Sequence, residues 1–571
     1  MELFLIDAIG PFFRRTQRRR INWSKIPFAD LDLPEGERRQ VFRDIRADLG
    51  TFLDRAAAAG FNAVTLDDVA HLADHPIYDP EVRAKVWRFR EEFPALFAEV
   101  AARGMRLFVT MDVFSATPSL RARLDDSPAQ INAFLAELID GFLDDFPQVD
   151  GIVMRIGESD GNDVKGAMRS DLYLRSARMV NRFLRDLLPV FERRGKRMIL
   201  RTWTVGAYAV GDLIWNRRTF RRAFEGIESR ALVVSMKYGE SDFFRFLPLN
   251  RNFFRTPLPK IIEVQARREY EGAGEFPSFV GWDLERYRDE LAEAENMVGI
   301  SVWCQTGGWH PFRRLAFLDD SAVWIDLNAR AAIHIFKEGG SAEGAVRRIA
   351  GPDRAAAAAE FLRLSDEVIR ALYYIEDFAG QKLFFRRVRI PPLIAVFWDT
   401  IFISHSVRKI VRHFVADPES SVREARAALS KLDRMIELAP AAGFPAADAR
   451  FMRDTFEILA LAREYFLLPY SGEIAARIRE AKRRYKDRYP RSGDRQRYRI
   501  RTDFTPFWLR RRYLGWVLSV CFRRQRGYRL IDRILTLHLL SVLYRLFRRA
   551  RPKAVPKFAR KRAMGIDAVF R

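Results

Sequence analysis

Short apolar segments alternate with longer amphipathic segments along the first 305 residues of the chain. Amphipathic segments of helical length cover residues 37–59, 81–103, 129–146 and 171–194. The apolar segments are rich in Val, Ile and Leu, and they cover residues 20–26, 62–66, 106–111, 151–156, 197–203, 232–238, 260–265 and 298–304. Strands that alternate with helices of this length pair in parallel. Eight such units predict an α/β fold, a closed (β/α)8 TIM barrel.

The pattern changes after residue 320, where the strand signal ends. Helical periodicity takes over in residues 322–337, 355–375, 393–414, 422–438, 447–466 and 471–486. A polar, arginine-rich stretch at residues 488–501 then precedes a basic end of the chain. We therefore expect a catalytic barrel at residues 1–320, an all-α domain at 321–505 and a basic amphipathic helical tail at 506–571.

Composition narrows the class of protein. Of the 571 residues, 48% are hydrophobic, which is ample for packed cores and excludes global disorder. Only Cys304 and Cys521 are present, so neither a disulfide framework nor a cysteine zinc site is expected. The first apolar run is very short and arginines follow it, unlike a secretory signal. These features favour a cytoplasmic protein, and no run approaches the roughly 18 apolar residues of a membrane span.

The net charge of +24 is concentrated at the end of the chain, where residues 510–571 carry +16. Two apolar runs there, residues 513–522 and 534–544, are flanked by arginines and are too short to cross a bilayer. They fit a helical pair packed on the preceding domain, the more common outcome for such charge runs. They also fit helices lying on the anionic inner face of a membrane. The aliphatic runs suit packing or lipid better than nucleic acid, which we do not expect as a partner.

Carboxylates follow three of the later apolar segments, where a parallel barrel carries its reactive groups. Glu158 follows the fourth segment and Asp242 the sixth, while Glu263 and Glu269 lie on and just beyond the seventh. Any one of them could simply pair with an arginine, and Glu263, inside the strand pattern, is the best suited to do so. Together they favour glycoside hydrolysis, which needs two carboxyl groups on opposite sides of the scissile bond.

Basic and aromatic residues accompany these acids. Arg155, Arg201 and Lys237 occupy matching heights on the fourth, fifth and sixth segments. Buried cations need partners, so they neutralise the acids, hold an anionic substrate through charge-assisted hydrogen bonds, or do both. Flat indoles near strand ends can stack on a sugar or simply pack; they belong to Trp203, Trp282, Trp303 and Trp309. No metal or cofactor is expected, because His71, His75 and His310 lack ligand spacing.

The order of these motifs resembles the α-glucuronidases of glycoside hydrolase family 67. Segments similar to that family's motifs are residues 60–69, 107–116, 150–158, 234–243 and 263–272, so that the resemblance covers roughly residues 20–350 by motif and the later helices by architecture. It implies Glu158 as general acid and Asp242 with Glu269, next to Tyr270, as the base pair. Substrate contacts are implied or expected for Arg155, Arg201, Lys237, Glu263, Trp203, Trp303 and Tyr270.

The chain departs from that family in several respects. We expect no amino-terminal β-sandwich, because the predicted barrel begins almost at once; the Arg155 motif is one residue shorter, and the basic tail has no counterpart. The resemblance therefore implies an oligo- or polysaccharide substrate containing a uronic acid, and a xylan-derived substrate is not assumed. The identity of the glycan, the leaving sugar and the oligomeric state stay open.

Three mechanisms or functions follow from these residues. In single displacement with inversion, Glu158 protonates the glycosidic oxygen while Asp242 and Glu269 activate water, at acid–base separations of about 6.5–9.5 Å. A retaining enzyme would instead use Glu158 as acid/base and Glu263 as nucleophile, roughly 5–5.5 Å apart. A non-catalytic protein that binds an acidic glycan and docks on a membrane surface is the third, because fold alone does not guarantee activity.

Overall fold

The structure is a computed structural model, and not every residue is described. It describes residues 1–15, 25–157, 168–204, 208–305, 314–385, 388–390, 396–397, 400–491, 495–506, 511–523, 530, 542–543, 546 and 549–550. Three residues singled out in the sequence, Glu158, Trp309 and His310, lie outside this part of the chain.

Eight parallel strands close into a barrel, which confirms the predicted (β/α)8 fold. In chain order they are β1 (Leu3–Asp7), β2 (Ala63–Leu66), β3 (Arg106–Asp112), β5 (Val149–Arg155), β7 (Arg197–Arg201), β8 (Leu232–Lys237), β9 (Lys260–Gln265) and β10 (Met297–Trp303). Strand β1 pairs with both β2 and β10 and so closes the barrel. A small two-stranded sheet joins β4 (Ser115–Ala116) to β6 (Arg169–Ser170) above it.

The first strand of the barrel differs from the sequence prediction. We expected it at residues 20–26, but β1 is Leu3–Asp7 and the barrel closes without the later segment. All five residues of β1 are buried. A strand covered on both faces needs only a short continuous apolar run, and this is what the start of the chain provides.

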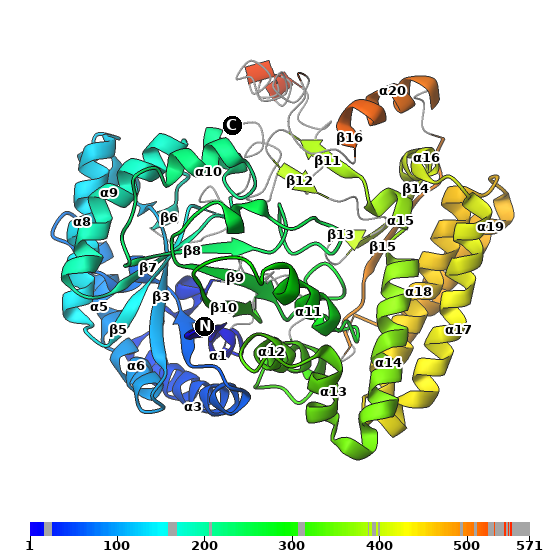
Figure 1. The fold of residues 1–571 in the computed structure, drawn as a ribbon, viewed down its shortest axis with the longest axis horizontal. Helices are drawn as coiled ribbons and strands as arrows, with labels where there is room; N and C mark the ends of the chain where they lie inside the picture. Colours follow the sequence, from blue (N-terminus) through cyan, green and yellow to red (C-terminus); the bar gives the residue numbers. More distant parts are fainter. Residues whose placement is uncertain are drawn as a thin grey trace.

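Helices surround the barrel on the outside (Figure 1). The principal ones are α3 (Glu35–Ala59), α5 (Pro80–Arg90), α6 (Phe93–Ala101), α8 (Pro128–Asp145), α9 (Ala177–Arg193), α10 (Arg217–Ala223) and α11 (Gly281–Glu290). Of these, α3, α5 with α6, α8 and α9 agree with the four amphipathic segments of the sequence, whereas α10 and α11 were not predicted. A continuous apolar core fills the space between these helices and the outer faces of the strands.

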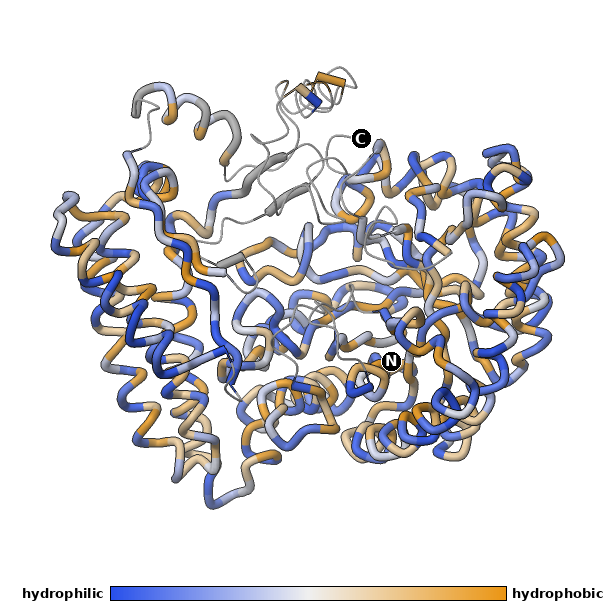
Figure 2. Tube along the Cα trace, turned by 180° about the vertical axis from the view of Figure 1, so that it is seen from behind, coloured by the Kyte–Doolittle hydropathy of each residue, from blue (hydrophilic) through white to orange (hydrophobic). Residues whose placement is uncertain are grey.

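A helical region follows the barrel, as predicted, and stands beside it as a bundle of long helices (Figure 1). Its helices are α12 (Val323–Phe336), α13 (Ala342–Ala350), α14 (Ala355–Val368), α15 (Glu376–Ala379), α16 (His405–Phe414), α17 (Pro418–Ala442), α18 (Ala446–Leu467) and α19 (Gly472–Arg488). Apolar and polar residues alternate along them, as expected for helices buried on one side (Figure 2). A single π-helical turn, η4 (Ile369–Tyr373), extends α14.

Two small sheets make the helical region less purely helical than predicted. One contains β11 (Lys382–Phe385), β12 (Val388–Ile390) and β16 (Phe522–Arg523), and the other β13 (Val396–Phe397), β14 (Thr400–Ser404) and β15 (Arg499–Asp503). The helix expected at residues 393–414 is therefore partly wrong. Of its described residues, 396–397 and 400–404 are strands and only those of α16 are helical. Ser404 caps the start of α16 by accepting a hydrogen bond from the backbone N–H of Val407.

The described part of the tail contains the helix α20 (Arg511–Cys521), which contacts α16. Leu514 and Leu518 are buried, whereas Tyr513 and Trp516 are 52% and 71% exposed. Packing on the helical region, one of the two expectations for the tail, thus holds for this helix. Among the described residues, none of the helices combines the length and apolar character needed to traverse a bilayer. The domain limits at residues 320 and 505 stay a prediction.

Candidate active site

The barrel interior changes from apolar to charged along its axis. Alternate residues of a strand point to the same side, and the inward set begins with one apolar layer. That layer consists of Leu3, Leu5, Ala63, Phe108, Val153, Ile199, Val233 and Ile261. Two residues further along the same strands come polar or charged side chains, among them Asp7, Thr110, Arg155, Arg201, Ser235 and Glu263. Asp112 follows two residues after Thr110. The strand pattern therefore gathers the charges at the carboxyl end of the barrel, where TIM barrels carry their sites.

Arg201 of β7 and Glu263 of β9 form a buried bidentate ion pair inside the barrel, past the intervening strand β8. Both nitrogen–oxygen distances, from Arg201 Nε and Nη2 to the two Glu263 oxygens, are 2.9 Å. Ser235 Oγ donates a further hydrogen bond to Glu263 at 2.6 Å. Burial alone would raise the pKa of Glu263, but the charge and hydrogen bonds of Arg201 hold that pKa below its usual value. Glu263 is thus an ionised counter-ion, the role that its place inside the strand suggested.

Lys237, Asp242 and Tyr270 form a second cluster at the carboxyl ends of β8 and β9. Lys237 Nζ lies 2.5 Å from Asp242 Oδ1, and Tyr270 donates its hydroxyl hydrogen bond to Asp242 Oδ2 at 2.8 Å. The ammonium also lies 4.3 Å from the ring centre of Trp203 and 4.1 Å from that of Phe243. Because Tyr270 follows Glu269 directly, this hydrogen bond joins the loop after β8 to the loop after β9.

Glu269 is oriented by Gln265, the last residue of β9. The backbone N–H of Glu269 donates to Gln265 Oε1 at 2.7 Å, and Gln265 Nε2 donates to Glu269 Oε2 at 3.2 Å. Both acids of the expected base pair are nearly buried, with Asp242 at 9% and Glu269 at 6% exposure. A cavity beside β8 and β9 is lined by Lys237, Asp242, Glu263 and Gln265, among others. Asp242 thus lines this cavity, and Glu269 is joined to Asp242 through the hydrogen bond of its neighbour Tyr270.

Arg155, the third expected cation, belongs to a different cluster. Its Nε lies 3.0 Å from Asp112 Oδ1 at the end of β3, and Lys25 also pairs with Asp112. Burial would raise the pKa of Asp112, but the charges of Lys25 and Arg155 lower it to about 2. Asp67, after β2, accepts hydrogen bonds from Thr110 and from the backbone N–H of Ile26. The sequence analysis gave none of these partners a role, although Asp67 and Asp112 lie in two of the quoted motifs.

Asp7 and Asp68 complete the acidic side of the barrel mouth and were also missed. Burial raises the pKa of each to about 7. The backbone N–H groups of Cys304 and Gln305 donate to Asp7 and oppose this rise, as the charges of Lys25 and Arg155 do for Asp68. Two carboxyl groups near the barrel mouth thus change protonation state close to neutral pH. The signal that could have found them is an aspartate at the end of each of the first two strands.

The expected aromatic residues separate into two groups. Trp203 lies under Lys237, and Trp303, which is almost fully buried, lies with its ring 4.4 Å from the guanidinium carbon of Arg201. These two are part of the charged region and stabilise its cations. Trp282 instead packs edge-on against Phe279 at the start of α11. The described part of the chain holds no group of three or more His, Cys, Asp or Glu side chains arranged for a metal ion.

The comparison with known proteins supports the fold and leaves the family open. The chain matches no protein-family model, and no curated protein matches it by sequence. Among solved structures it is similar to a family 138 glycoside hydrolase targeting pectin rhamnogalacturonan II, with a TM-score of 0.51 and 11% identity over 86% of this chain and 73% of that one.

Two further similar structures have lower scores. A mutant O-GlcNAc hydrolase from Thermobaculum terrenum has a TM-score of 0.37 and 13% identity, over 77% of this chain and 86% of that one. A β-mannanase from the blue mussel Mytilus edulis has a TM-score of 0.33 and 13% identity, over 60% of this chain and 94% of that one. These neighbours are glycoside hydrolases built on TIM barrels. The resemblance to family 67 in particular stays a prediction.

Proposed function

We propose that the protein hydrolyses a glycosidic bond next to a uronic acid, in an α-glucuronide-like glycan, by single displacement with inversion. Asp242 and Glu269 activate the attacking water, and Glu158 protonates the leaving oxygen. The observation that supports this most is the hydrogen bond from Tyr270 to Asp242, because it links the two base-bearing loops at the barrel mouth. A paired base of this kind suits an inverting enzyme, which needs room for a water molecule.

Lys237 is the cation best suited to the carboxylate of the substrate. An ammonium group has three donors, and its hydrogen bond to Asp242 uses one of them. Arg201 is committed by two hydrogen bonds to Glu263, and Arg155 is paired with Asp112. We therefore assign to these two arginines chiefly the neutralisation of buried acids, and to Lys237 and Trp203 direct contact with the sugar.

The retaining alternative, with Glu263 as nucleophile, is less favourable. Glu263 accepts hydrogen bonds from Arg201 and Ser235, and its pKa is below the usual glutamate value. Both effects stabilise the carboxylate and make it a weaker nucleophile. A non-catalytic protein that binds an acidic glycan remains the alternative from another class, and an activity assay separates it from the enzymes.

The test is release of uronic acid from a panel of aryl and oligosaccharide α-glucuronides, with the matching α-glucosides as neutral controls. We expect turnover of glucuronides by the native protein and preference over glucosides. Glu158→Gln should abolish turnover and spare ligand binding, and Asp242→Asn should lower kcat by roughly a hundred-fold or more. A fully active Glu158→Gln variant contradicts the assignment of the acid, and glycan binding without turnover supports the non-catalytic alternative.

We also propose that the tail contacts an anionic membrane through one face of α20. Leu514 and Leu518 pack inward, while Tyr513 and Trp516 stand exposed on the other side. Aromatic side chains of this kind favour the membrane interface, and the charge of +16 over residues 510–571 complements anionic lipid.

A further inference from the structure

The loop after β9 carries Glu269 and Tyr270 and has an unusual backbone. Arg268 and Ala273 have φ values of 51° and 50°, in the left-handed region that side chains other than glycine rarely adopt. Such a conformation persists only where the surrounding structure holds it in place. The loop is therefore shaped by its contacts, and two of them, from Tyr373 and Tyr374, come from the helical region beyond the barrel.

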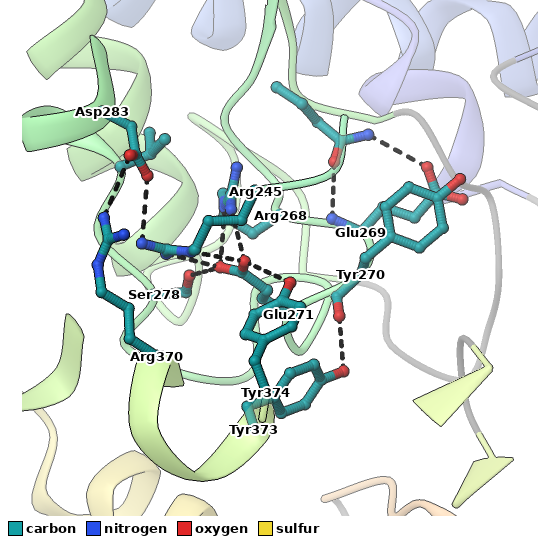
Figure 3. Close-up of polar contacts among 12 residues, drawn as sticks. Arg245, Arg268, Glu269, Tyr270, Glu271, Ser278, Asp283, Arg370, Tyr373 and Tyr374 are labelled. Carbon is teal, nitrogen blue, oxygen red and sulfur yellow. Dashed lines mark hydrogen bonds and ion pairs between the residues drawn. The ribbon is translucent and has the colours of Figure 1, made fainter. Parts of the chain in front are cut away.

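Glu271 is the centre of a buried ionic network in this loop (Figure 3). Arg245, from the loop after β8, binds it with two contacts of 2.8 Å, and Arg268 binds it at 2.8 Å. Ser278 Oγ and Tyr374 OH donate to it at 2.8 and 2.7 Å. Burial would raise the pKa of Glu271, but the charges of Arg245 and Arg268 hold it well below its usual value. Glu271 is thus an ionised anchor.

The network joins three parts of the molecule. Arg245 is three residues beyond Asp242, so its bonds to Glu271 tie together the two loops that carry the proposed base pair. Arg245 Nη1 also lies 2.5 Å from Asp366 Oδ1 on α14 and 3.2 Å from Asp283 Oδ2 on α11. Arg370, in the π-helical turn, contacts both of these aspartates. Ion pairs therefore connect the helical region directly to the loops at the barrel mouth.

The π-helical turn makes the closest contact with the base-bearing segment. Tyr373 donates its hydroxyl hydrogen bond to the backbone oxygen of Tyr270 at 2.6 Å. Tyr270 in turn donates to Asp242 (Figure 3 shows Tyr270 between Tyr373 and Glu269). Tyr373 and Tyr374 are both almost fully buried. A π turn widens the helix by one residue, and it directs these two neighbouring tyrosines to the backbone of Tyr270 and the carboxylate of Glu271.

We propose that Tyr373 and Tyr374, from the helical region, are positioning residues for the hydrolytic base pair. They fix the segment from Arg268 to Glu271, and through it the carboxylate of Glu269 and the hydroxyl of Tyr270 against Asp242. This inference rests on the proposed function for its catalytic consequence, but the ordering of the loop is a separate property. Small displacements of groups that orient a reacting water are costly, by up to about a hundred-fold for a shift of about 1 Å.

The test compares Tyr373→Phe with Tyr485→Phe. Tyr485 is a buried tyrosine of the same helical region whose hydroxyl accepts hydrogen bonds from Thr455 and from the backbone N–H of Tyr498. The ring of Tyr498 stacks on Phe276, so the segment compared ends at residue 272, before that contact. Both changes delete one buried hydroxyl. Hydrogen–deuterium exchange of residues 266–272 is measured on the full chain, together with kcat and KM on the aryl α-glucuronide that the native protein hydrolyses fastest.

We expect Tyr373→Phe to speed exchange in residues 266–272 by at least about ten-fold, whereas Tyr485→Phe leaves it unchanged. We also expect Tyr373→Phe to lower kcat by roughly ten-fold or more with KM nearly constant. Unchanged exchange, or a kcat loss equal to that of Tyr485→Phe, overturns the inference. If the native protein cleaves no glycoside, the proposed function fails, and the exchange measurement still decides whether Tyr373 orders the loop.

Discussion

At the scale of single residues, the carboxyl groups near the barrel mouth are of two types, those with a lowered pKa and those with a raised pKa. Asp112 and Glu263 are held ionised by Lys25, Arg155 and Arg201. Asp7 and Asp68 instead have their pKa raised to about 7 by burial. A buried carboxyl that is neutral at mild acidity can donate a hydrogen bond to a sugar hydroxyl, which an ionised one cannot. The two types therefore differ in charge and in hydrogen-bonding capacity near neutral pH.

Asp68 makes the stability of the protein depend on pH. Its pKa in the folded state, about 7, lies above the value of about 3.9 in an unfolded chain. Between these values the folded protein holds a proton that the unfolded chain lacks, so the free energy of unfolding falls as pH rises through about 4 to 7. Asp68→Asn removes this penalty and can still cap α4. The variant should therefore gain stability over the native protein at pH 8 relative to pH 5.

Urea titrations at the two pH values provide the measurement. Asp353→Asn, at an exposed residue after α13, serves as the control and should leave the pH dependence unaltered. Asp7 keeps its own contribution in the Asp68→Asn variant, so the pH dependence should weaken without vanishing. An equal stability difference at pH 5 and pH 8 would show that Asp68 does not retain its proton on folding.

The sequence predicted which residues lie at the site better than it predicted which of them pair with one another. The strand-end pattern indicated Asp242, Glu269 and the cations Arg201 and Lys237, because alternation along a strand fixes which side chains point inward. It could not say that Arg201 would bind Glu263, since that pairing depends on the register of β7, β8 and β9. Lys25 and Tyr373 were missed for another reason, because in the structure they reach the barrel mouth from outside the barrel strands. Glu158 lies outside the described residues, so its role stays a prediction.

At the scale of elements, the barrel depends on close approach between neighbouring strands. A Cβ atom added at Gly299 of β10 would lie 1.8 Å from the backbone oxygen of Leu3 in β1. Backbone cannot move aside as a flexible side chain can, so this pair of strands requires glycine. The sequence analysis missed β1 because its run of four apolar residues, 3–6, is very short. Buried parallel strands need no polar alternation, which removes the usual signal.

Gly299→Ala should therefore weaken closure of the barrel between β1 and β10. We expect a loss of about 1–3 kcal/mol or more in the free energy of unfolding, measured by urea titration. Gly141→Ala is the matched control, because Gly141 is an exposed residue of α8 with no atom near the added Cβ. That change should instead raise stability by about 0.5–1 kcal/mol. Equal effects at the two positions would contradict the role of Gly299.

The exposed face of α20 predicts lipid binding that depends on its aromatic residues. Trp516→Ser should reduce sedimentation of the protein with phosphatidylserine-containing vesicles by several-fold, because the indole favours the interface. Tyr470→Ser is the control, since Tyr470 is 51% exposed but lies outside the tail. Added salt should weaken binding to these vesicles, and neutral phosphatidylcholine vesicles should bind poorly. Equal binding of both variants would rule out α20 as the contact surface.

At the scale of the whole molecule, the helical region is joined to the barrel by several ion pairs. Arg245, Asp366 and Arg370 link the two through buried charge, and Arg314 beyond β10 pairs with Asp448 of α18 at 2.6 Å. Helical periodicity predicted that region and most of its helices. Its attachment could not be predicted, because ion pairs between residues more than a hundred positions apart leave no local pattern. The small sheets were missed because their strands are only two to five residues long.

The account rests on an acid and a paired base acting on opposite faces of one α-linked uronic acid. The most direct test is proton NMR of the sugar first released from an aryl α-glucuronide by the native protein, with Asp242→Asn as the control. We predict that the β-anomer of the free uronic acid appears first and only later equilibrates, and that Asp242→Asn releases almost none. Initial release of the α-anomer, or equal release by Asp242→Asn, would contradict the account.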